Sequence, residues 1–202
     1  PDRAVNTVLE TRDGTIWVAT NGGGAARFDP RGSLGNDGAR RFFTTFRVGP
    51  DRRTNRVNPL AEDESGTLWA ATDGGLFHMT RHAGVFTPVS LASLHLPEDL
   101  YIGDLVTGQN GELWLATTQG LVRRLTDGRG TTYVATIDLA RPCVRRVLAD
   151  DRTGLVWAGS TGGLLVLARR PVGTVLTGAP GPPTSCPAVR GAVHLPGRPG
   201  GC

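Results

Sequence analysis

Histidine pairs are the first places to look for metal or acid–base chemistry in this sequence, which contains four histidines. His78 and His82 are four residues apart, a spacing that binds a metal ion when both side chains lie on one helical turn. His78, however, belongs to the apolar stretch "LFHM" at 76–79, which is typical of a β-strand, and His82 falls in the following turn. His95 and His194 stand alone. We therefore predict no metal site.

Carboxylates gather at two places, "AEDESG" at 61–66 and "LADDRTG" at 148–154. Neither stretch has the alternate-position spacing of a calcium-binding loop, so we interpret both as solvated turns. No serine lies in a nucleophile-elbow pattern, and "NGGG" at 21–24 does not join a strand to a helix as a phosphate-binding loop does. The sequence predicts no catalytic residue and no cofactor.

The overall charge and the cysteines exclude several other classes of protein. The formal net charge is +4, all basic residues are arginines, and no basic run is interleaved with aromatic residues, so we expect no nucleic-acid partner. No apolar run reaches the roughly 18 residues of a membrane-spanning helix, so no membrane contact is expected within this sequence. Three cysteines are too few and too far apart for a disulfide framework or a zinc site with four cysteine ligands.

A tryptophan-centred phrase that occurs four times says most about how side chains are positioned. It reads "GTIWVATNGG" at 14–23, "GTLWAATDGG" at 66–75, "GELWLATTQG" at 111–120 and "GLVWAGSTGG" at 154–163. The tryptophans follow one another at intervals of 52, 45 and 43 residues. Such intervals are those of a propeller blade, which is a sheet of four strands.

Each phrase contains the signals of a strand between two tight turns. The glycine three residues before each tryptophan favours a hairpin turn, because glycine accepts positive φ, and a second glycine-containing turn starts four residues after the tryptophan. The strand between them is apolar on both faces, so we expect a blade covered on both sides. A hydroxyl residue ends each strand, and we expect it to close the second turn by a local hydrogen bond: Thr20, Thr72, Thr117 and Ser160.

Strand-like segments before and after each phrase complete four strands per repeat. The sequence therefore predicts an all-β protein of β-propeller blades, each with four antiparallel strands. The propeller region is 1–177, with blades at about 4–48, 56–90, 101–137 and 143–177 and the last outer strand at 173–177. Residues 178–202 are rich in proline and glycine and cannot bury enough apolar surface to order themselves, so we expect a disordered tail.

The pattern V-N-x-x-x-E-D-x-x-G-x-L-W-x-x-T-x-x-G-L, most complete at Val57 to Leu76, resembles the two-component regulator propeller repeat. In that family the repeats build seven-bladed propellers in the extracytoplasmic sensors of hybrid histidine kinases. The resemblance therefore implies that the four repeats form a partial arc of a seven-bladed propeller. When the repeats are aligned by counting from the tryptophan, two residues depart from the pattern. Gly24 stands in the first repeat where the second has Leu76, and Arg145 stands in the fourth where the second has Val57.

The same resemblance implies a function and a location. It suggests a non-catalytic propeller fragment that senses a ligand or partner in a bacterial two-component signalling receptor, in the periplasm or another extracytoplasmic compartment. Any kinase activity would reside in a domain absent from this chain. The expected partners are a small-molecule or glycan ligand, the rest of the propeller, a signalling output domain and a second copy of the chain in a homodimer.

Propeller geometry suggests that a ligand would bind where the outer strand of one blade returns to the inner strand of the next. The predicted ligand-binding residues form a polar and cationic set that suits a carboxylated or sugar ligand: Arg53, Asn55, Arg56, Asn58, Tyr101 and Arg141. The alternative is that these residues form ordinary surface loops.

Two other functions remain open at this point. A propeller lyase would need histidines or paired carboxylates at the channel end of the inner strands, whereas counting places four other residues there: Asn6, Asn58, Gly103 and Arg146. A purely structural interaction platform would bind protein partners and show no saturable binding of small molecules.

Overall fold

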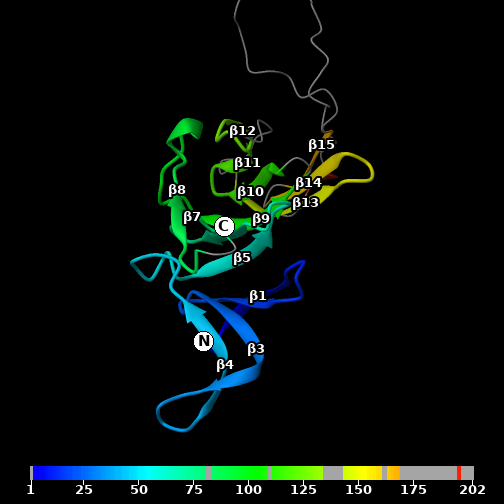
Figure 1. Ribbon diagram of the computed structural model, residues 1–202. Helices are drawn as coiled ribbons and strands as arrows, with labels where there is room; N and C mark the ends of the chain where they lie inside the picture. Colours follow the sequence, from blue (N-terminus) through cyan, green and yellow to red (C-terminus); the bar gives the residue numbers. More distant parts are fainter. Residues whose placement is uncertain are drawn as a thin grey trace, which may run out of the picture.

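The computed structural model describes residues 2–80, 83–108, 111–133, 143–160, 163–168 and 195–196. They form four sheets of four antiparallel strands, and in each sheet the strands neighbour one another in chain order (Figure 1). Each sheet is one blade. The all-β prediction is therefore confirmed, and the only helix among these residues is a short 3₁₀ turn, η1 (Ala92–Leu94). No described helix has the length and apolar character needed to cross a membrane.

The strands of the four blades are as follows. Blade 1 contains β1 (Val5–Glu10), β2 (Ile16–Thr20), β3 (Ala25–Leu34) and β4 (Arg40–Phe46); blade 2 contains β5 (Val57–Glu62), β6 (Leu68–Thr72), β7 (Gly75–Met79) and β8 (Thr87–Val89). Blade 3 contains β9 (Ile102–Thr107), β10 (Leu113–Thr117), β11 (Gly120–Arg124) and β12 (Gly130–Tyr133); blade 4 contains β13 (Val144–Asp150), β14 (Leu155–Ser160), β15 (Gly163–Ala168) and β16 (Leu195–Pro196).

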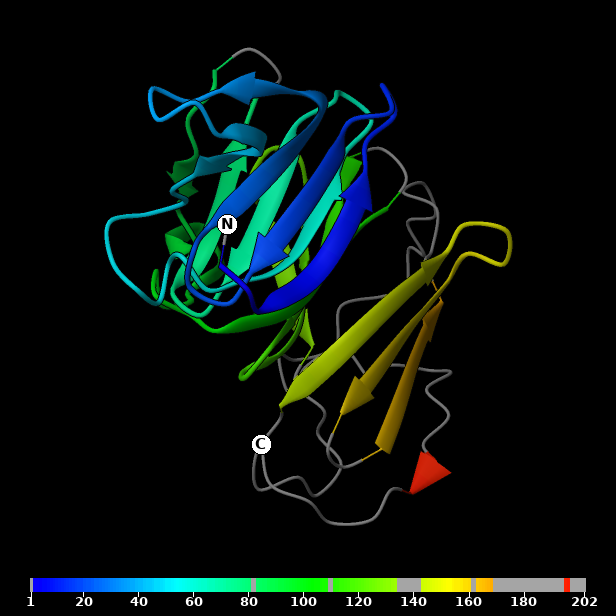
Figure 2. The ribbon, with the colours of Figure 1, turned by 90° about the horizontal axis from the view of Figure 1, so that it is seen from below.

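The first strand of each blade is its inner strand. β1 contacts β5, β5 contacts β9 and β9 contacts β13, so the inner strands lie beside one another along the arc. Blade 1, in blue, and blade 4, in yellow to orange, lie at opposite ends of this arc (Figure 2). The chain therefore forms part of a β-propeller.

Three apolar clusters lie between successive blades, and all three are built alike. One blade contributes its tryptophan face, which carries the repeat tryptophan and the small residue two positions later. The next blade contributes its aliphatic face, which carries Val57 and Leu60 in blade 2 and their counterparts in the other blades. The three tryptophans at these interfaces, Trp17, Trp69 and Trp114, are 6%, 8% and 2% exposed. Burial on both faces explains why the middle strands are apolar throughout.

The two turns of each phrase have the predicted geometry. The glycines of the first turn adopt positive φ, from 67° at Gly154 to 79° at Gly14 and Gly66. In the second turn each hydroxyl donates a hydrogen bond to a glycine carbonyl oxygen, 2.8 Å from Thr72 to Gly75 and 3.0 Å from Ser160 to Gly163. The predicted hydrogen bond that closes the turn is confirmed in all four blades.

The second turn of blade 1 corrects the alignment of Gly24. Ala25 pairs with Ala19 as Leu76 pairs with Ala71, so Ala25 and not Gly24 takes the place of Leu76. The turn "NGGG" is one residue longer than its counterparts, and counting from the tryptophan therefore slipped by one position. Gly24 instead has positive φ, 78°, like Gly75.

The inner strand of blade 4 corrects a second alignment. Val144 pairs with Ser160 as Val57 pairs with Thr72, so Val144 takes the apolar position and Arg145 corresponds to Asn58. Between the equivalent pairs Ala149–Val156 and Glu62–Leu68, the hairpin of blade 4 holds one more residue than that of blade 2, which shifts a count made backwards from Trp157. The fourth channel-end residue is therefore Arg145 rather than Arg146.

The outer strand of blade 4 also differs from the prediction. The expected segment at 173–177 lies outside the described residues. Leu195 and Pro196, from the segment expected to be a disordered tail, pair with Leu164 and Gly163 as β16. The rest of the expected tail lies outside the described residues.

Candidate functional site

Three of the predicted ligand-binding residues converge on Asp73, in the turn between β6 and β7. Arg53 Nη2 donates to the Asp73 carbonyl oxygen at 2.7 Å, and Asn58 Nδ2 donates to Asp73 Oδ1 at 3.1 Å. Arg56 Nη1 lies 3.5 Å from Asp73 Oδ2. The cluster joins the connection between blades 1 and 2 to a turn of blade 2, so its first role is to fix the shape of this face.

Arg53 extends the same cluster toward blade 3. Its guanidinium donates to Asp99 Oδ2 at 2.9 Å and to the Asp99 carbonyl oxygen at 3.0 Å. The two side chains are 54% and 72% exposed, so this ion pair is solvated and contributes little to stability. The Arg53 guanidinium therefore remains accessible to a ligand that carries an acceptor such as a carboxylate.

Asn55 holds its own loop together. Its side chain is buried, accepts a hydrogen bond from Val48 N at 3.0 Å, and donates to the carbonyl oxygens of Gly49 and Asp51. Its carbonyl oxygen accepts the Gly24 N–H of blade 1 at 2.9 Å. The amide group is thus engaged inside the protein, and its role is to position the loop around it.

Of the two remaining predicted residues, one packs on a nearby glycine and the other lies outside the described residues. Tyr101 is 39% exposed, and its ring covers Gly103, where an added Cβ would lie 3.1 Å from Tyr101 Cε1. Arg141 lies outside the described residues. The structure therefore brings together Arg53, Arg56 and Asn58, and it assigns Asn55 to the framework of the loop.

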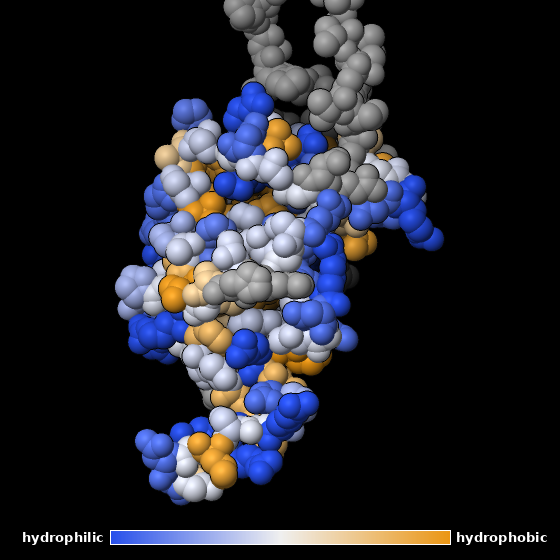
Figure 3. Space-filling model, in the orientation of Figure 1, coloured by the Kyte–Doolittle hydropathy of each residue, from blue (hydrophilic) through white to orange (hydrophobic). Residues whose placement is uncertain are grey.

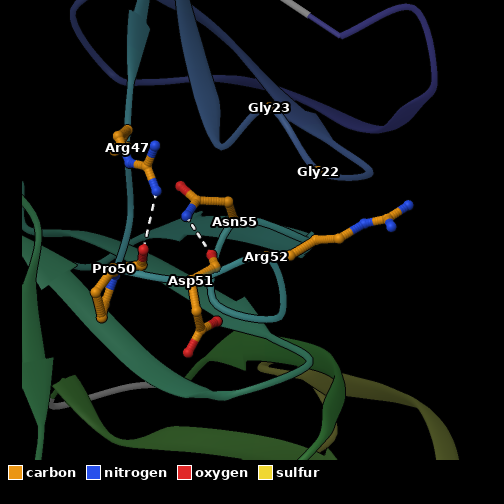
Figure 4. A pocket seen from close by; sticks show the side chains of 7 residues that line it. All are labelled: Gly22, Gly23, Arg47, Pro50, Asp51, Arg52 and Asn55. Atoms are coloured by element: carbon orange, nitrogen blue, oxygen red, sulfur yellow. Dashed lines mark hydrogen bonds between the residues drawn. The ribbon is translucent and has the colours of Figure 1, made fainter.

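A pocket of about 340 Å³ lies beside this cluster, between the second turn of blade 1 and the connection to blade 2 (Figure 4). It is lined by Gly22, Gly23, Arg47, Pro50, Asp51, Arg52 and Asn55. Arg47 Nη2 donates to the Pro50 carbonyl oxygen at 3.0 Å. In Figure 4 the Arg52 side chain extends away from the other labelled side chains, toward open space.

The charges around this pocket favour an anionic guest. The pKa of Asp51 is lowered, chiefly by the hydrogen bond from the Thr54 N–H, so this carboxylate stays ionised and engaged with its own turn. Arg47 and Arg52 bring two positive charges to the lining against the single carboxylate of Asp51, and arginine suits carboxylate recognition because its N–H donors form a planar fork.

The sequence prediction missed Arg47, Arg52 and the two glycines of this pocket. Two signals could have found them: the additional glycine of "NGGG" at 21–24, and the arginine-rich connection "RVGPDRRTNR" at 47–56. What the sequence could not reveal is that these two segments, from successive blades, face each other across one hollow.

The channel end of the inner strands serves mainly to join blades. Asn6 Nδ2 donates to the Val57 carbonyl oxygen at 2.8 Å, and Asn58 Nδ2 donates to the Ile102 carbonyl oxygen at 2.9 Å. His78 packs against Trp69 with a centroid separation of 5.3 Å, and His95 is exposed on its turn. Within the described part of the chain no group of three or more His, Cys, Asp or Glu residues could hold a metal ion.

A family comparison agrees with the repeat pattern. The model of the family "Two component regulator propeller" matches residues 1–22, which include the first tryptophan phrase except its last glycine. The first repeat of the chain is therefore similar to the two-component regulator propeller repeat. No curated protein matches the chain.

Solved structures with the same architecture include extracellular domains of two component systems and an enzyme. The extracellular domain of the B. thetaiotaomicron hybrid two component system BT3049 has a TM-score of 0.61 and 22% identity over 81% of this chain and 22% of that one. The corresponding domain of BT4673, also from B. thetaiotaomicron, has a TM-score of 0.57 and 17% identity over 83% of this chain and 28% of that one. A streptogramin B lyase has a TM-score of 0.59 and 17% identity over 83% of this chain and 52% of that one.

These similarities establish the fold and its extent. The chain spans 22% and 28% of the two extracellular domains and 52% of the lyase. At such low identities the likeness concerns the backbone architecture, so the described blades are part of a β-propeller.

Proposed function

We propose that these blades belong to the non-catalytic sensing region of a bacterial two-component signalling receptor, which binds a ligand or partner and transmits the event to a separate output domain. The observation that carries the proposal is the repeat itself, which matches the regulator propeller family and folds as blades. Extracellular domains of hybrid two component systems share the architecture. Any kinase activity belongs to the output domain.

An extracytoplasmic location fits two observations. Three of the similar solved structures are described as extracellular domains. In addition, Cys143 is disulfide-bonded, and disulfides persist mainly in oxidising compartments such as the periplasm and the cell exterior.

The ligand that the geometry suits best is a small molecule or saccharide with a carboxylate group. Arg47 and Arg52 line the pocket, and Arg53 and Arg56 stand on the same connection between blades. A carboxylate would accept bidentate hydrogen bonds from arginine, and hydroxyl groups would suit the exposed backbone of the glycine turn.

Isothermal titration calorimetry with trigalacturonate, against neutral maltotriose, tests this proposal. Saturable binding of the acidic probe alone is expected, and it should weaken at least about tenfold in the Arg47→Ala/Arg52→Ala variant, because each lost charge-assisted hydrogen bond is worth about 1.5–3 kcal/mol. Arg152→Ala is the matched control, since Arg152 is exposed on a turn of blade 4. Unchanged affinity in the double variant would contradict the assigned site, and no saturable binding would favour the interaction platform.

The lyase alternative has no specific support in the described residues. A lyase shares the fold, but the corrected channel-end positions hold two amides engaged with neighbouring blades, a glycine and an arginine: Asn6, Asn58, Gly103 and Arg145. An acid–base pair needs two titratable groups whose pKa values are set apart by their environment, and these positions do not provide one. We therefore propose no enzymatic activity.

A further inference from the structure

The outer strand of blade 1, β4, forms a free edge that is longer than propellers normally leave. Among the described strands β4 pairs only with β3, on one of its two sides. Propellers usually leave short, protected edges, because an exposed strand edge is a template for pairing with another chain. The corresponding strand of blade 2, β8, has three residues with Pro88 at its centre, whereas β4 has seven residues and no proline.

The free edge of β4 points away from the propeller axis. The inner strands of successive blades lie beside one another, and β4 is the last strand of its sheet. Figure 1 shows that β3 and β4 also continue into a hairpin that projects from the rest of the described structure. Neighbouring blades pack on the faces of a sheet rather than on its outer edge, so this edge stays open whatever the number of blades.

The hydrogen-bond register indicates which backbone groups of β4 face outward. Thr20 N donates to the Gly24 carbonyl oxygen at 3.1 Å, at the start of the pairing between β2 and β3. From this bond, the alternation of antiparallel pairing directs the backbone groups of Thr44 toward β3. The N–H and C=O groups of Phe43 and Thr45 therefore point to the free edge, where a further strand could pair with them.

One face of β4 also offers side-chain contacts to an added strand. Alternate residues of a strand share a face, so Phe42 and Thr44 lie on the same face as Phe46. Phe46 packs against Trp17 at the junction with blade 2, with ring centroids 5.1 Å apart. Phe42 is 42% exposed and Thr44 is exposed although blade 2 is in place. Apolar side chains of an added strand would pack beside these two residues.

The charges around β4 favour an acidic strand over a second copy of this chain. The hairpin at 25–47 contains five arginines and two aspartates, which gives a net charge of +3 (5 − 2). Arg40 and Arg41 begin β4, and Arg47 directly follows it. A second β4 would bring arginines against arginines in either direction of pairing, and like charges on paired strands repel. Acidic residues at the two ends of an added strand would instead meet a cation at each end.

We propose that β4 binds an extended peptide segment of another protein as a fifth strand of blade 1. The segment has acidic residues at both ends and apolar residues between them. In such strand addition, main-chain hydrogen bonds provide the affinity and alternate side chains provide the specificity. The proposal does not depend on the sensing function, and Arg47, which also lines the pocket, is left unchanged in the test.

Fluorescence anisotropy of a labelled peptide, titrated with the 202-residue chain, tests this proposal. The probe has two glutamates at each end and alternating valine and threonine between them, and it should bind saturably. Replacing its central valine by proline should weaken binding at least about tenfold, because proline lacks the N–H group that pairs with the edge. Replacing its glutamates by lysines should weaken binding by at least as much, because lysines would face the arginines of the hairpin.

Two variants of the protein separate backbone pairing from charge. Thr45→Pro removes an outward N–H group, a change that edge strands tolerate, and should weaken binding at least about tenfold with an unchanged circular dichroism spectrum. Arg40→Glu/Arg41→Glu should reverse the preference, so that the lysine peptide binds more tightly than the acidic one. Arg129→Glu/Arg152→Glu is the matched control for charge, because these side chains are 81% and 92% exposed on other blades, and it should keep the wild-type preference.

Four outcomes would overturn the proposal. The acidic probe would fail to bind at about 1 mM protein, or the lysine peptide would bind the wild type equally well. Undiminished binding by Thr45→Pro would show that the peptide does not pair with the edge. Self-association of the wild type in sedimentation velocity that Thr45→Pro abolishes would show that a second copy of the chain occupies β4.

Discussion

The inner pair of blades and the terminal pair carry the same repeat, but they experience different surroundings. Trp114 in blade 3 is 2% exposed and lies between two blades, whereas Trp157 in blade 4 is only half-buried. Leu60 in blade 2 is 5% exposed, whereas Val8 in blade 1 is 61% exposed. Each blade supplies apolar side chains to two neighbours, and the burial of those side chains depends on whether both neighbours are present.

In the inner blades the indole N–H group of each tryptophan donates a hydrogen bond to a buried carboxylate. Trp69 Nε1 donates to Asp63 Oδ2 at 2.8 Å, and Trp114 Nε1 donates to Glu112 Oε1 at 2.9 Å. Asp63 and Glu112 are 8% and 5% exposed. A buried carboxylate needs hydrogen-bond partners, and the indole N–H groups provide them. These contacts therefore allow the blades to pack tightly around the carboxylates.

The largest expected difference comes from replacing the tryptophans. Trp114→Ala should lower the free energy of unfolding by about 3–5 kcal/mol, because it empties a buried site between blades 3 and 4. Trp157→Ala should cost less than about half as much, since its ring is partly solvated in the folded chain. Urea denaturation of both variants under dilute, monomeric conditions measures the two costs. Equal losses of unfolding free energy in the two variants would contradict the view that Trp114 is packed more completely than Trp157.

A second pair compares the aliphatic faces. Leu60→Ala should destabilise the fold by about 2–5 kcal/mol, as for a leucine in a packed core. Val8→Ala should change stability by less than about 1 kcal/mol in the monomer, because the side chain remains largely in water. Thermal unfolding followed by circular dichroism measures both effects, and a large loss for Val8→Ala would mean that the face is covered within the chain.

A smaller effect concerns Asp63, whose place in terminal blade 1 is taken by Thr11. Burial raises the pKa of Asp63, but hydrogen bonds from Ser65, Trp69 and Thr67 outweigh it and hold the pKa below 3.8. A pKa lowered by folding means that the ionised form stabilises the protein above 3.8, and that this contribution is lost as the pH falls through the folded-state value.

Asp63→Asn should therefore show a shallower loss of stability than the wild type between about pH 5 and pH 2.5. Urea midpoints measured across that range provide the comparison. Glu64→Gln, on the exposed part of the same turn, is the control and should follow the wild-type curve. Identical acid profiles for Asp63→Asn and the wild type would show that this carboxylate does not stabilise the blade in its ionised form.

Local signals in the sequence predicted the blades well because each acts within a few residues. The glycines at the two turns, the apolar strand between them and the hydroxyl that closes the second turn all lie within one phrase, and all have the predicted roles. Their effects depend on backbone geometry that the neighbouring residues alone determine.

Alignment between repeats was less reliable because it depends on turn length. One additional residue in "NGGG" displaced Gly24, and one in the hairpin between the pair Ala149–Val156 displaced Arg145. Only the pairing register shows which strand residue lies opposite which, and a count along the chain cannot detect a lengthened turn.

The candidate site was the least predictable part, because it depends on contacts between segments that are distant in sequence. The set of polar residues on the correct face included Arg53, Arg56 and Asn58, which do converge on Asp73. Asn55 could not be separated from them, since an asparagine that holds its loop and one that awaits a ligand look alike in a sequence. The pocket residues Arg47 and Arg52 become visible only when two blades are placed side by side.

Hydrogen–deuterium exchange measured by mass spectrometry tests the central claim most directly. Our account predicts that β6 and β10, in the blades with two described neighbours, exchange most slowly. The equivalent strands β2 and β14, in the terminal blades, should exchange faster. Equal protection of all four strands would contradict the claim that packing on both sides of a blade protects its strands.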